Sequence, residues 1–231
     1  MNKSKLIKKI TGKEVKLDSQ VSIYYLIQRG IPYVAGLLRG ALRKFGLNHS
    51  GRKLFLGRHV RMLSKKNISF GNNVRIDSNT TIDALSKNGI TLKDNVKIGE
   101  YSKIIGSGSI SDIGKGLEIG NNTSFSEYTF FGAAGGIVIG DDVIAGQNVR
   151  FHAENHNYSD REKLIREQGV NRKGIKVGNN CWIGAGATFL DGSEIGDGCI
   201  VAANAVVTKK FPVNSIIGGV PAKVISERLN N

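Results

Sequence analysis

The sequence predicts an all-β solenoid, a parallel β-helix built from hexapeptide repeats, and two observations lead to it. From about residue 70 onward, six-residue units recur that begin with an aliphatic residue or Phe, often followed by Gly, and carry a small or branched fifth residue. The clearest run starts its units at positions 177, 183, 189, 195 and 201. The chain also holds 30 Gly residues without a three-residue Gly period, which indicates many tight turns and excludes collagen.

The six-residue period has a simple physical meaning. The fifth residue of one unit and the first of the next are two positions apart, so they share one face of an extended chain. Cys181 and Ile183 are therefore expected to point inward, and Trp182 between them outward. Gly, Asn and Asp follow in each unit and tolerate the positive φ of a turn. Three units close a triangular coil, and stacked coils bury an aliphatic column. A β-sandwich would space its turns about 8–12 residues apart.

The two cysteines agree with this arrangement. Cys181 and Cys199 lie one coil apart, so they are expected to stack on the inner face of neighbouring coils. A disulfide is conceivable at this spacing. Buried thiols in the small-residue position are the preferred interpretation.

The register breaks at four places, and functional sites are expected where a regular pattern fails. The longest break follows Phe151 and lasts until Ile175. It is a polar loop that contains His152 and His156, and long loops in compact domains are usually functional. Shorter irregularities lie at residues 85–89, 106–112 and 131–136.

The net charge of +14 is confined to one end of the chain. Residues 1–66 hold 16 Lys and Arg and two acidic residues, whereas residues 67–231 hold 17 of each sign. This distribution argues against nucleic-acid binding. It divides the chain into a basic helical N-terminal segment and a β-helix domain. The predicted bounds are 1–54 and 55–231, with the loop at 152–174 and a C-terminal tail at 212–231.

Residues 20–47 carry apolar clusters at helical spacing with basic residues between them. The run Gly30, Ile31 and Pro32 is expected to break or kink this segment, which suggests two short amphipathic basic helices. One interpretation is attachment of residues 1–47 to an anionic membrane surface, and the other is a cap on the open end of the solenoid. The two are compatible. With no recognisable export signal and few cysteines, we expect a cytoplasmic protein, peripheral to the inner face of the membrane.

Three features together resemble the hexapeptide-repeat acetyltransferases. They are the repeat itself, the loop sequence NHNYSD that begins at Asn155, and the ending GGVPAKVI over residues 218–225. The similarity is to the maltose and galactoside, the xenobiotic and the surface-polysaccharide O-acetyltransferases, and it is strong over about residues 115–228. It implies a left-handed β-helix, a homotrimer and acetyl-CoA as cosubstrate, with no metal ion required.

Acetyl transfer from a thioester to a hydroxyl group needs a base, and the pKa of histidine suits that role. The resemblance places the base at His156, with His152 as the reserve candidate. A metal site built from both is disfavoured because no Cys or carboxylate accompanies them at ligand spacing. Either Glu154 or Asp160 is available to orient the His156 ring.

The resemblance also assigns the donor and acceptor sites. Turns with small side chains let the pantetheine arm approach the backbone, and cationic side chains suit its phosphates. The implied CoA contacts are Trp182, Gly184, Ala185, Ala202, Ala203, Thr208, Lys209 and Lys223. For Trp182, packing between subunits is the alternative. The sequence departs from the sugar enzymes at Ser126 and Glu127, which we assign with His152 to acceptor binding.

These observations leave three hypotheses open. The leading one is an acetyl-CoA-dependent O-acetyltransferase that acts on a sugar or surface-polysaccharide precursor. The second is an N-acetyltransferase of a nucleotide-linked amino sugar, or a xenobiotic acetyltransferase. The third is a non-catalytic β-helix scaffold, which predicts no binding of acetyl-CoA.

Overall fold

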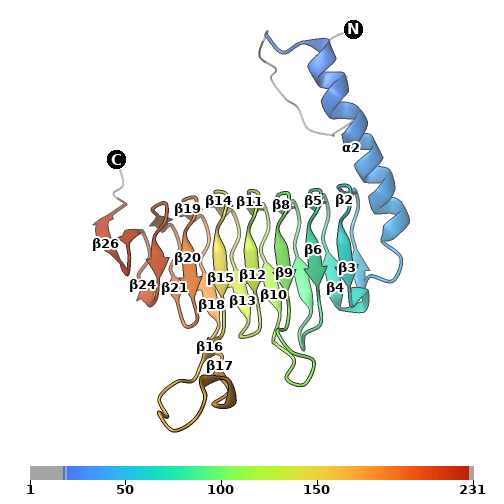
Figure 1. Ribbon diagram of the computed structural model, residues 1–231. Helices are drawn as coiled ribbons and strands as arrows, with labels where there is room; N and C mark the ends of the chain where they lie inside the picture. The colour runs from blue at the N-terminus through green and yellow to red at the C-terminus, as the bar shows by residue number, and fades with distance from the viewer. Residues whose placement is uncertain (1–17, 19, 229–231) are drawn as a thin grey trace.

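The computed structural model describes residues 18 and 20–228, and most of them form a left-handed β-helix of triangular coils (Figure 1). Three parallel sheets make the sides of this prism, which we call faces A, B and C. Face A consists of β1 (His49–Ser50), β4 (Ile68–Phe70), β7 (Ile90–Leu92), β10 (Leu117–Ile119), β13 (Ile137–Ile139), β18 (Ile175–Val177), β21 (Glu194–Ile195) and β24 (Lys210–Phe211). The fold class predicted from the repeat is confirmed.

Faces B and C complete each coil. Face B consists of β2 (Phe55–Leu56), β5 (Arg75–Ile76), β8 (Lys97–Ile98), β11 (Ser124–Phe125), β14 (Ile144–Ala145), β19 (Trp182–Ile183), β22 (Ile200–Val201), β25 (Ser215–Gly219) and the antiparallel β26 (Ala222–Glu227). Face C consists of β3 (Arg61–Leu63), β6 (Thr81–Asp83), β9 (Lys103–Ile105), β12 (Phe130–Gly132), β15 (Arg150–His152), β20 (Thr188–Leu190) and β23 (Val206–Val207). The first coil begins at β1, inside the segment predicted as N-terminal, because residues 49–63 pair in register with the second coil.

The core is one continuous apolar column. Phe151 stacks on Phe131 at 5.3 Å between ring centroids and on Phe189 at 4.8 Å, so three neighbouring coils share an aromatic stack. All three side chains are fully buried. Cys181 and Cys199 are buried free thiols, as expected from their place in the repeat. Burial raises the pKa of the Cys181 thiol to about 12.

A ladder of amide and carboxylate side chains runs along the turns that lead from face A to face B, the A–B corner. Asp94 accepts hydrogen bonds from the backbone N–H of Asn72 at 2.7 Å and from its amide at 3.1 Å. Asn121 in turn accepts from the backbone N–H of Asp94. The ladder joins six successive coils through Asn72, Asp94, Asn121, Asp141, Asn179 and Asp197.

Residues 23–43 form one continuous helix, α2 (Ile23–Arg43), with Pro32 inside it, so the expected division into two short helices at this point is wrong. Proline removes one backbone hydrogen bond from a helix interior. Here the carbonyl left without a donor belongs to Gln28, which is exposed, so water can serve as its donor. Two short 3₁₀ turns, η1 (Lys65–Asn67) and η2 (Ile165–Glu167), are the other helical elements of residues 20–228. None of the helices in the described residues has the length and apolar character that a membrane crossing requires.

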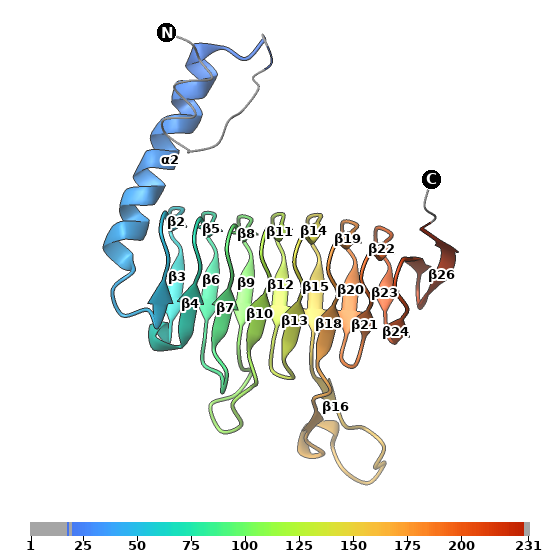
Figure 2. The ribbon, with the colours of Figure 1, turned by 180° about the vertical axis from the view of Figure 1, so that it is seen from behind.

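The second half of α2 packs against the first coil. Gly36 and Gly40 are buried because Phe55 and the backbone of Leu54 come too close for a side chain. The Tyr33 ring stacks on Phe55 at 5.6 Å. The helix thus covers part of the open end of the solenoid, while its first half stands away from it (Figures 1 and 2). Residues 1–17 and 19 of the basic segment lie outside the described residues.

Candidate functional site

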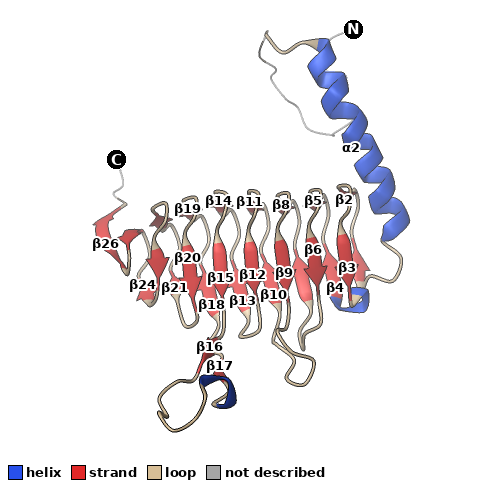
Figure 3. Ribbon diagram, in the orientation of Figure 1, coloured by secondary structure: helices blue, strands red, loops and turns tan. Residues whose placement is uncertain are grey.

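All four breaks in the hexapeptide register fall on one edge of the prism. They are the connections that lead from a strand of face C to the next strand of face A, the C–A corner. Figure 3 shows them as loops on the lower edge, below an otherwise regular stack of strands. The two largest are residues 106–116, which separate β9 from β10, and residues 153–174, which separate β15 from β18. Stacking of the coils therefore brings together segments that are far apart in the sequence.

His156 lies on a small hairpin that projects from this corner. The hairpin pairs β16 (Asn155–His156) with β17 (Val170–Asn171) in antiparallel register, with His156 opposite Val170. The His156 side chain is exposed. The hydrogen bonds that hold the loop are therefore made by neighbouring polar residues.

Polar side chains fix the course of the loop beyond the hairpin. The Gln168 amide donates to the carbonyls of Asp160 at 2.7 Å and Lys163 at 2.9 Å, and its oxygen accepts from the backbone N–H of Asp160. The Asn157 amide donates to the carbonyl of Gln168 and accepts from the Asn171 amide. These hydrogen bonds give a solvent-exposed loop a defined shape.

Arg172 ties the loop to its neighbour at the same corner. Its Nε lies 2.6 Å from a carboxylate oxygen of Glu154, and its Nη1 lies 2.9 Å from a carboxylate oxygen of Asp112. Burial by itself lowers the pKa of Arg172, but the hydrogen bonds and charges of Glu154 and Asp112 raise it overall. The guanidinium is therefore charged and joins residues 106–116 to the base of the His156 hairpin.

Neither acid expected to orient His156 does so within one chain. Glu154 is bound to Arg172, and Asp160 lies near Lys163 and accepts from the backbone N–H of Glu162. Within residues 20–228, no group hydrogen-bonds to the His156 ring. Both ring nitrogens of His156 are therefore without a hydrogen-bond partner in this part of the chain.

His152 occupies a different setting on the outer surface of face C. Its ring lies 5.3 Å from that of Phe130. Partial burial lowers the pKa of His152, and the charge of Arg150 lowers it further. The ring borders a hollow of about 200 Å³ whose floor includes Gly132 and Ala133. His152 is therefore an uncharged, partly enclosed imidazole at neutral pH.

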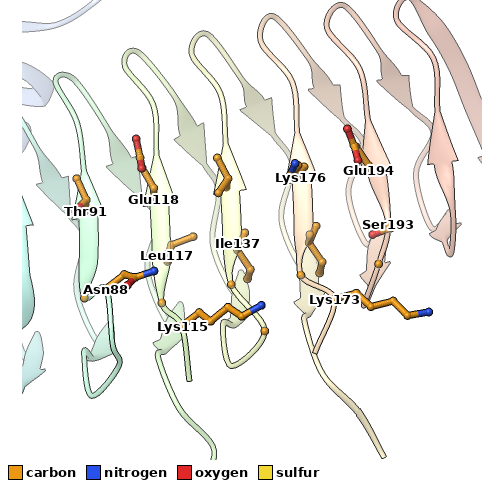
Figure 4. A pocket seen from close by; sticks show the side chains of 18 of the residues that line it. Asn88, Thr91, Lys115, Leu117, Glu118, Ile137, Lys173, Lys176, Ser193 and Glu194 are labelled. Carbon is orange, nitrogen blue, oxygen red and sulfur yellow. The ribbon is translucent and has the colours of Figure 1, made fainter. Parts of the chain in front are cut away.

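A larger groove, of about 450 Å³, runs along face A beside the same corner (Figure 4). Lys115 and Lys173 line the groove at the corner, and Lys176 lines it from β18. Its two acids are paired, because Glu118 lies 2.7 Å from Lys93 and Glu194 lies 2.9 Å from Lys210. The groove therefore has a cationic character, although the sequence analysis did not select it.

Backbone glycines shape the corner side of this groove. Gly116, Gly136 and Gly174 occupy equivalent positions in successive coils, and each has a positive φ, at 117°, 92° and 93°. Other residues seldom adopt this conformation. Three of the register breaks thus end at a glycine with positive φ, and these glycines leave the backbone accessible beside the groove.

The predicted donor-site residues lie on two different edges. Trp182 points outward from face B, as expected, and is 55% exposed. Gly184 and Ala185 lie at the turn from face B to face C, the B–C corner, and the turn of the next coil holds Ala202 and Ala203. By contrast, Thr208 and Lys209 lie at the C–A corner, between β23 and β24.

Lys223 and two of the three predicted acceptor residues also lie on the side of face B. Lys223 is paired with Gly218 in the sheet that continues from Trp182. Ser126 and Glu127 lie at the B–C corner of an earlier coil. One chain therefore does not bring them together with His152 and His156.

An aromatic pair next to Glu127 was missed by the sequence analysis. The rings of Tyr101 and Tyr128 stack at 5.1 Å with an interplanar angle of 8°. Both residues have positive φ, at 58° and 60°, in the turn position that Asn occupies in other coils. Tyr101 and Tyr128 are 27 residues apart, which is also the separation of equivalent residues in these two coils. Two bulky residues at the same turn position could therefore have predicted the pair from the sequence.

Comparison with known proteins agrees with the fold and the repeat. Residues 174–209 match the family model described as bacterial transferase hexapeptide (six repeats). The galactoside O-acetyltransferase of Escherichia coli K12 is 31% identical over 121 residues, which cover 49% of this chain and 55% of that protein. Another E. coli protein, WbbJ, named as an O-acetyl transferase of lipopolysaccharide biosynthesis, is 28% identical over 160 residues, 69% of this chain and 71% of that protein.

Two further comparisons give a shorter sequence match and a likeness of fold. An acetyltransferase of Mycobacterium tuberculosis is 35% identical over 92 residues, which cover 31% of that protein. The structure of AntD, an N-acyltransferase from Bacillus cereus in complex with dTDP and 3-hydroxybutyryl-CoA, superposes with a TM-score of 0.56 at 20% identity, covering 83% of this chain and 88% of that one. At that identity the likeness shows the fold alone.

Proposed function

The chain belongs to the bacterial hexapeptide-repeat transferases, and from this we propose that it moves an acetyl group from acetyl-CoA to a hydroxyl group of a sugar or surface-polysaccharide precursor. The observation that carries the proposal is the position of His156. It stands exposed on a hairpin, at the corner where all four register breaks gather. Relatives named as O-acetyltransferases support the reaction type.

In this reaction His156 is the general base. The imidazole takes the proton of the acceptor hydroxyl as its oxygen attacks the thioester carbonyl carbon. The tetrahedral intermediate then expels the CoA sulfur, which receives that proton from the imidazolium. No metal ion enters these steps. The hydrogen bonds around Gln168 and the ion pairs of Arg172 hold the base in place.

A homotrimer would complete the site. The residues assigned to CoA and acceptor lie mostly along face B and the B–C corner, whereas both histidines lie toward the C–A corner. If face B of one copy packed against the C–A corner of another, the residues assigned to CoA in the first copy would lie beside the histidines of the second. Trp182, which is half exposed beside Ile144 and Ile200 in adjacent strands, suits such an interface.

The pantetheine arm would then run past the small residues of the B–C corner, including Gly184 and Ala202. Thr208, Lys209 and Lys223 would bind the adenine and phosphates.

Acyl groups other than acetyl are also candidates for transfer, since AntD was solved with 3-hydroxybutyryl-CoA. Ser126, Glu127 and His152 stay predictions for the acceptor. We place the reaction in the cytoplasm.

N-acyl transfer to a nucleotide-linked amino sugar is the second candidate. It is favoured by the fold likeness to AntD, whose structures include one with an amino-sugar nucleotide. The cationic groove along face A would suit the phosphates of such an acceptor. The two reactions differ in the atom that attacks, so a panel of hydroxyl and amine acceptors separates them.

The test is release of CoA thiol from acetyl-CoA in the presence of sugars, amino sugars and lipid-linked glycans. We expect His156→Ala to lower kcat/KM by about 10²–10⁴-fold, the usual contribution of a general base. His49→Ala, which alters an exposed histidine in the first coil, is the matched control and should leave the rate unchanged. Near-normal turnover by His156→Ala would refute the assignment, and absence of acetyl-CoA binding would favour a scaffold.

A further inference from the structure

Helix α2 carries an apolar stripe that the solenoid does not cover. Large apolar side chains recur at every third or fourth position along the whole helix. They are Ile23, Ile27, Ile31, Val34, Leu38, Leu42 and, just beyond its end, Phe45. Each is at least 44% exposed. Contiguous apolar surfaces of this kind mark interaction sites in water-soluble domains.

This stripe is separate from the face of α2 that packs on the first coil. The packing face consists of Gly36, Gly40 and Tyr33, which meet Leu54 and Phe55. Figures 1 and 2 show the first half of the helix standing clear of the solenoid in both views. The helix therefore has one face that fixes it to the protein and another that is free to meet a partner.

The charge around the stripe is of one sign. Residues 20–76 contain eleven Lys and Arg and no Asp or Glu. Arg75 is paired with Asp77, whereas Arg39 and Arg43 bind backbone carbonyls of Leu56 and Val60, so most of the positive charge at this end of the molecule is retained. Beyond residue 76 the two signs nearly balance.

We propose that α2 docks on an anionic lipid surface, with the apolar stripe in the headgroup region and the basic residues of α2 and the first coil against the headgroups. An exposed apolar stripe flanked by basic residues is the pattern of an interfacial helix. Basic clusters are attracted to anionic leaflets. This inference goes beyond the proposed reaction and does not depend on it.

The alternative occupant of the stripe is a second copy of the same helix. Its spacing of three and four residues would suit the packing of two helices, but paired helices of this kind commonly place opposite charges beside the seam. Here both copies would bring only positive charge, because residues 20–76 contain no acid. Like charges at such an interface disfavour association. The charge pattern therefore favours lipid over self-association.

Docking in this way leaves the candidate site uncovered. In both views α2 rises from one edge of the solenoid, whereas the His156 hairpin projects from the opposite edge (Figures 1 and 2). The hairpin and the helix also lie several coils apart, since α2 contacts β2 in the first coil and the hairpin follows β15 in the fifth. A lipid surface that holds the helix would not block the hairpin.

The test is cosedimentation of the full chain with vesicles of phosphatidylcholine alone or mixed with phosphatidylglycerol. We expect binding to the mixed vesicles that falls as salt is raised. The double variant Ile31→Asn/Leu38→Asn should bind at least about tenfold more weakly, because both side chains belong to the stripe. Ile110→Asn changes an apolar residue that is 88% exposed in a loop and is the matched control, with unchanged binding.

Circular dichroism and thermal unfolding establish that each variant is folded, and light scattering gives its mass. Equal binding to both kinds of vesicle, or unchanged binding of the double variant, would overturn the proposal. So would an absence of binding together with a loss of mass in the double variant, which would identify the stripe as a contact between copies. Acetyl transfer is measured separately, so failure of the reaction and failure of docking are distinguishable.

Discussion

The Arg172 guanidinium lies 2.6 Å from the Glu154 carboxylate, and this pair closes the base of the hairpin that carries His156. The Arg172 side chain is only 15% exposed, and it also reaches Asp112 across the corner. Removing it would leave two carboxylates facing each other without a cation. We expect Arg172→Ala to lower kcat/KM by about 10–100-fold through displacement of the base. The measurement is steady-state kinetics beside limited proteolysis, which should cut residues 153–174 faster.

Lys163→Ala is the matched control, since Lys163 lies in the same loop but is exposed and 3.5 Å from Asp160. Surface pairs contribute little, so its kinetics should be unchanged. Arg172→Lys should recover only part of the activity, because one ammonium does not reproduce the two-sided contact. Unchanged proteolysis and unchanged kinetics in Arg172→Ala would show that the pair does not position the hairpin.

Much of the fold is predictable because the inward positions of a β-helix repeat along the chain. The register from Val177 to Val207 appears as six-residue units in the sequence and as regular coils in the structure. The continuity of α2 through Pro32 was not predictable in this way. It depends on whether the carbonyl of Gln28 can reach water, which a local pattern does not reveal.

The site is only partly predictable for a related reason. Each register break was visible in the sequence, and the loop histidines could be selected from it. That the breaks share one corner depends on how many residues close each coil. The contact between Asp112 and Arg172 spans 60 residues and has no local signal. The stacking of Tyr101 on Tyr128 likewise arises only when two turns become neighbours.

The pH dependence of turnover should distinguish the two loop histidines. Burial and the charge of Arg150 lower the pKa of His152 from 6.5, so this ring is uncharged at neutral pH. We expect that protonation of His152 does not set the acid limb of log kcat/KM against pH. His152→Gln should therefore leave the midpoint of that limb in place and lower the rate by less than about tenfold. A displaced or missing limb in that variant would make His152 the base instead.

Two glycines should respond in opposite ways to the same substitution. A Cβ at Gly184 would lie 2.5 Å from the backbone nitrogen of Ala203 in the next coil, and backbone cannot move aside cheaply. We expect Gly184→Ala to destabilise the fold by about 1–3 kcal/mol, as overpacking does. At Gly30 in α2, nothing lies within 4 Å of the added atom. Gly30→Ala should stabilise the helix by about 0.5–1 kcal/mol.

Chemical unfolding with circular dichroism measures both changes. Unfolding of the solenoid reports Gly184→Ala, and loss of helical signal reports Gly30→Ala. If Gly184→Ala were as stable as the parent chain, the close packing of the turns at the B–C corner would be disproved.

The ladder at the A–B corner should make part of the free energy of unfolding depend on pH in the acid range. The hydrogen bonds from the backbone and side chain of Asn72 lower the pKa of Asp94 below 3.8. A carboxyl group whose pKa falls on folding stabilises the protein above its unfolded pKa and loses that effect as pH falls through the folded value. We therefore expect Asp94→Asn to lower Tm by a constant amount between pH 5 and pH 8. The difference from the parent chain should shrink below pH 4.

Glu118→Gln is a suitable comparison, because Glu118 carries one charge of the same sign and pairs with Lys93 on an exposed surface. Its effect on Tm should be smaller, since exposed pairs contribute little. Thermal unfolding from pH 3 to pH 8 measures both variants. A difference for Asp94→Asn that stays constant down to pH 3 would mean that the shape of the amide and carboxylate ladder, and not the charge of Asp94, supports the A–B corner.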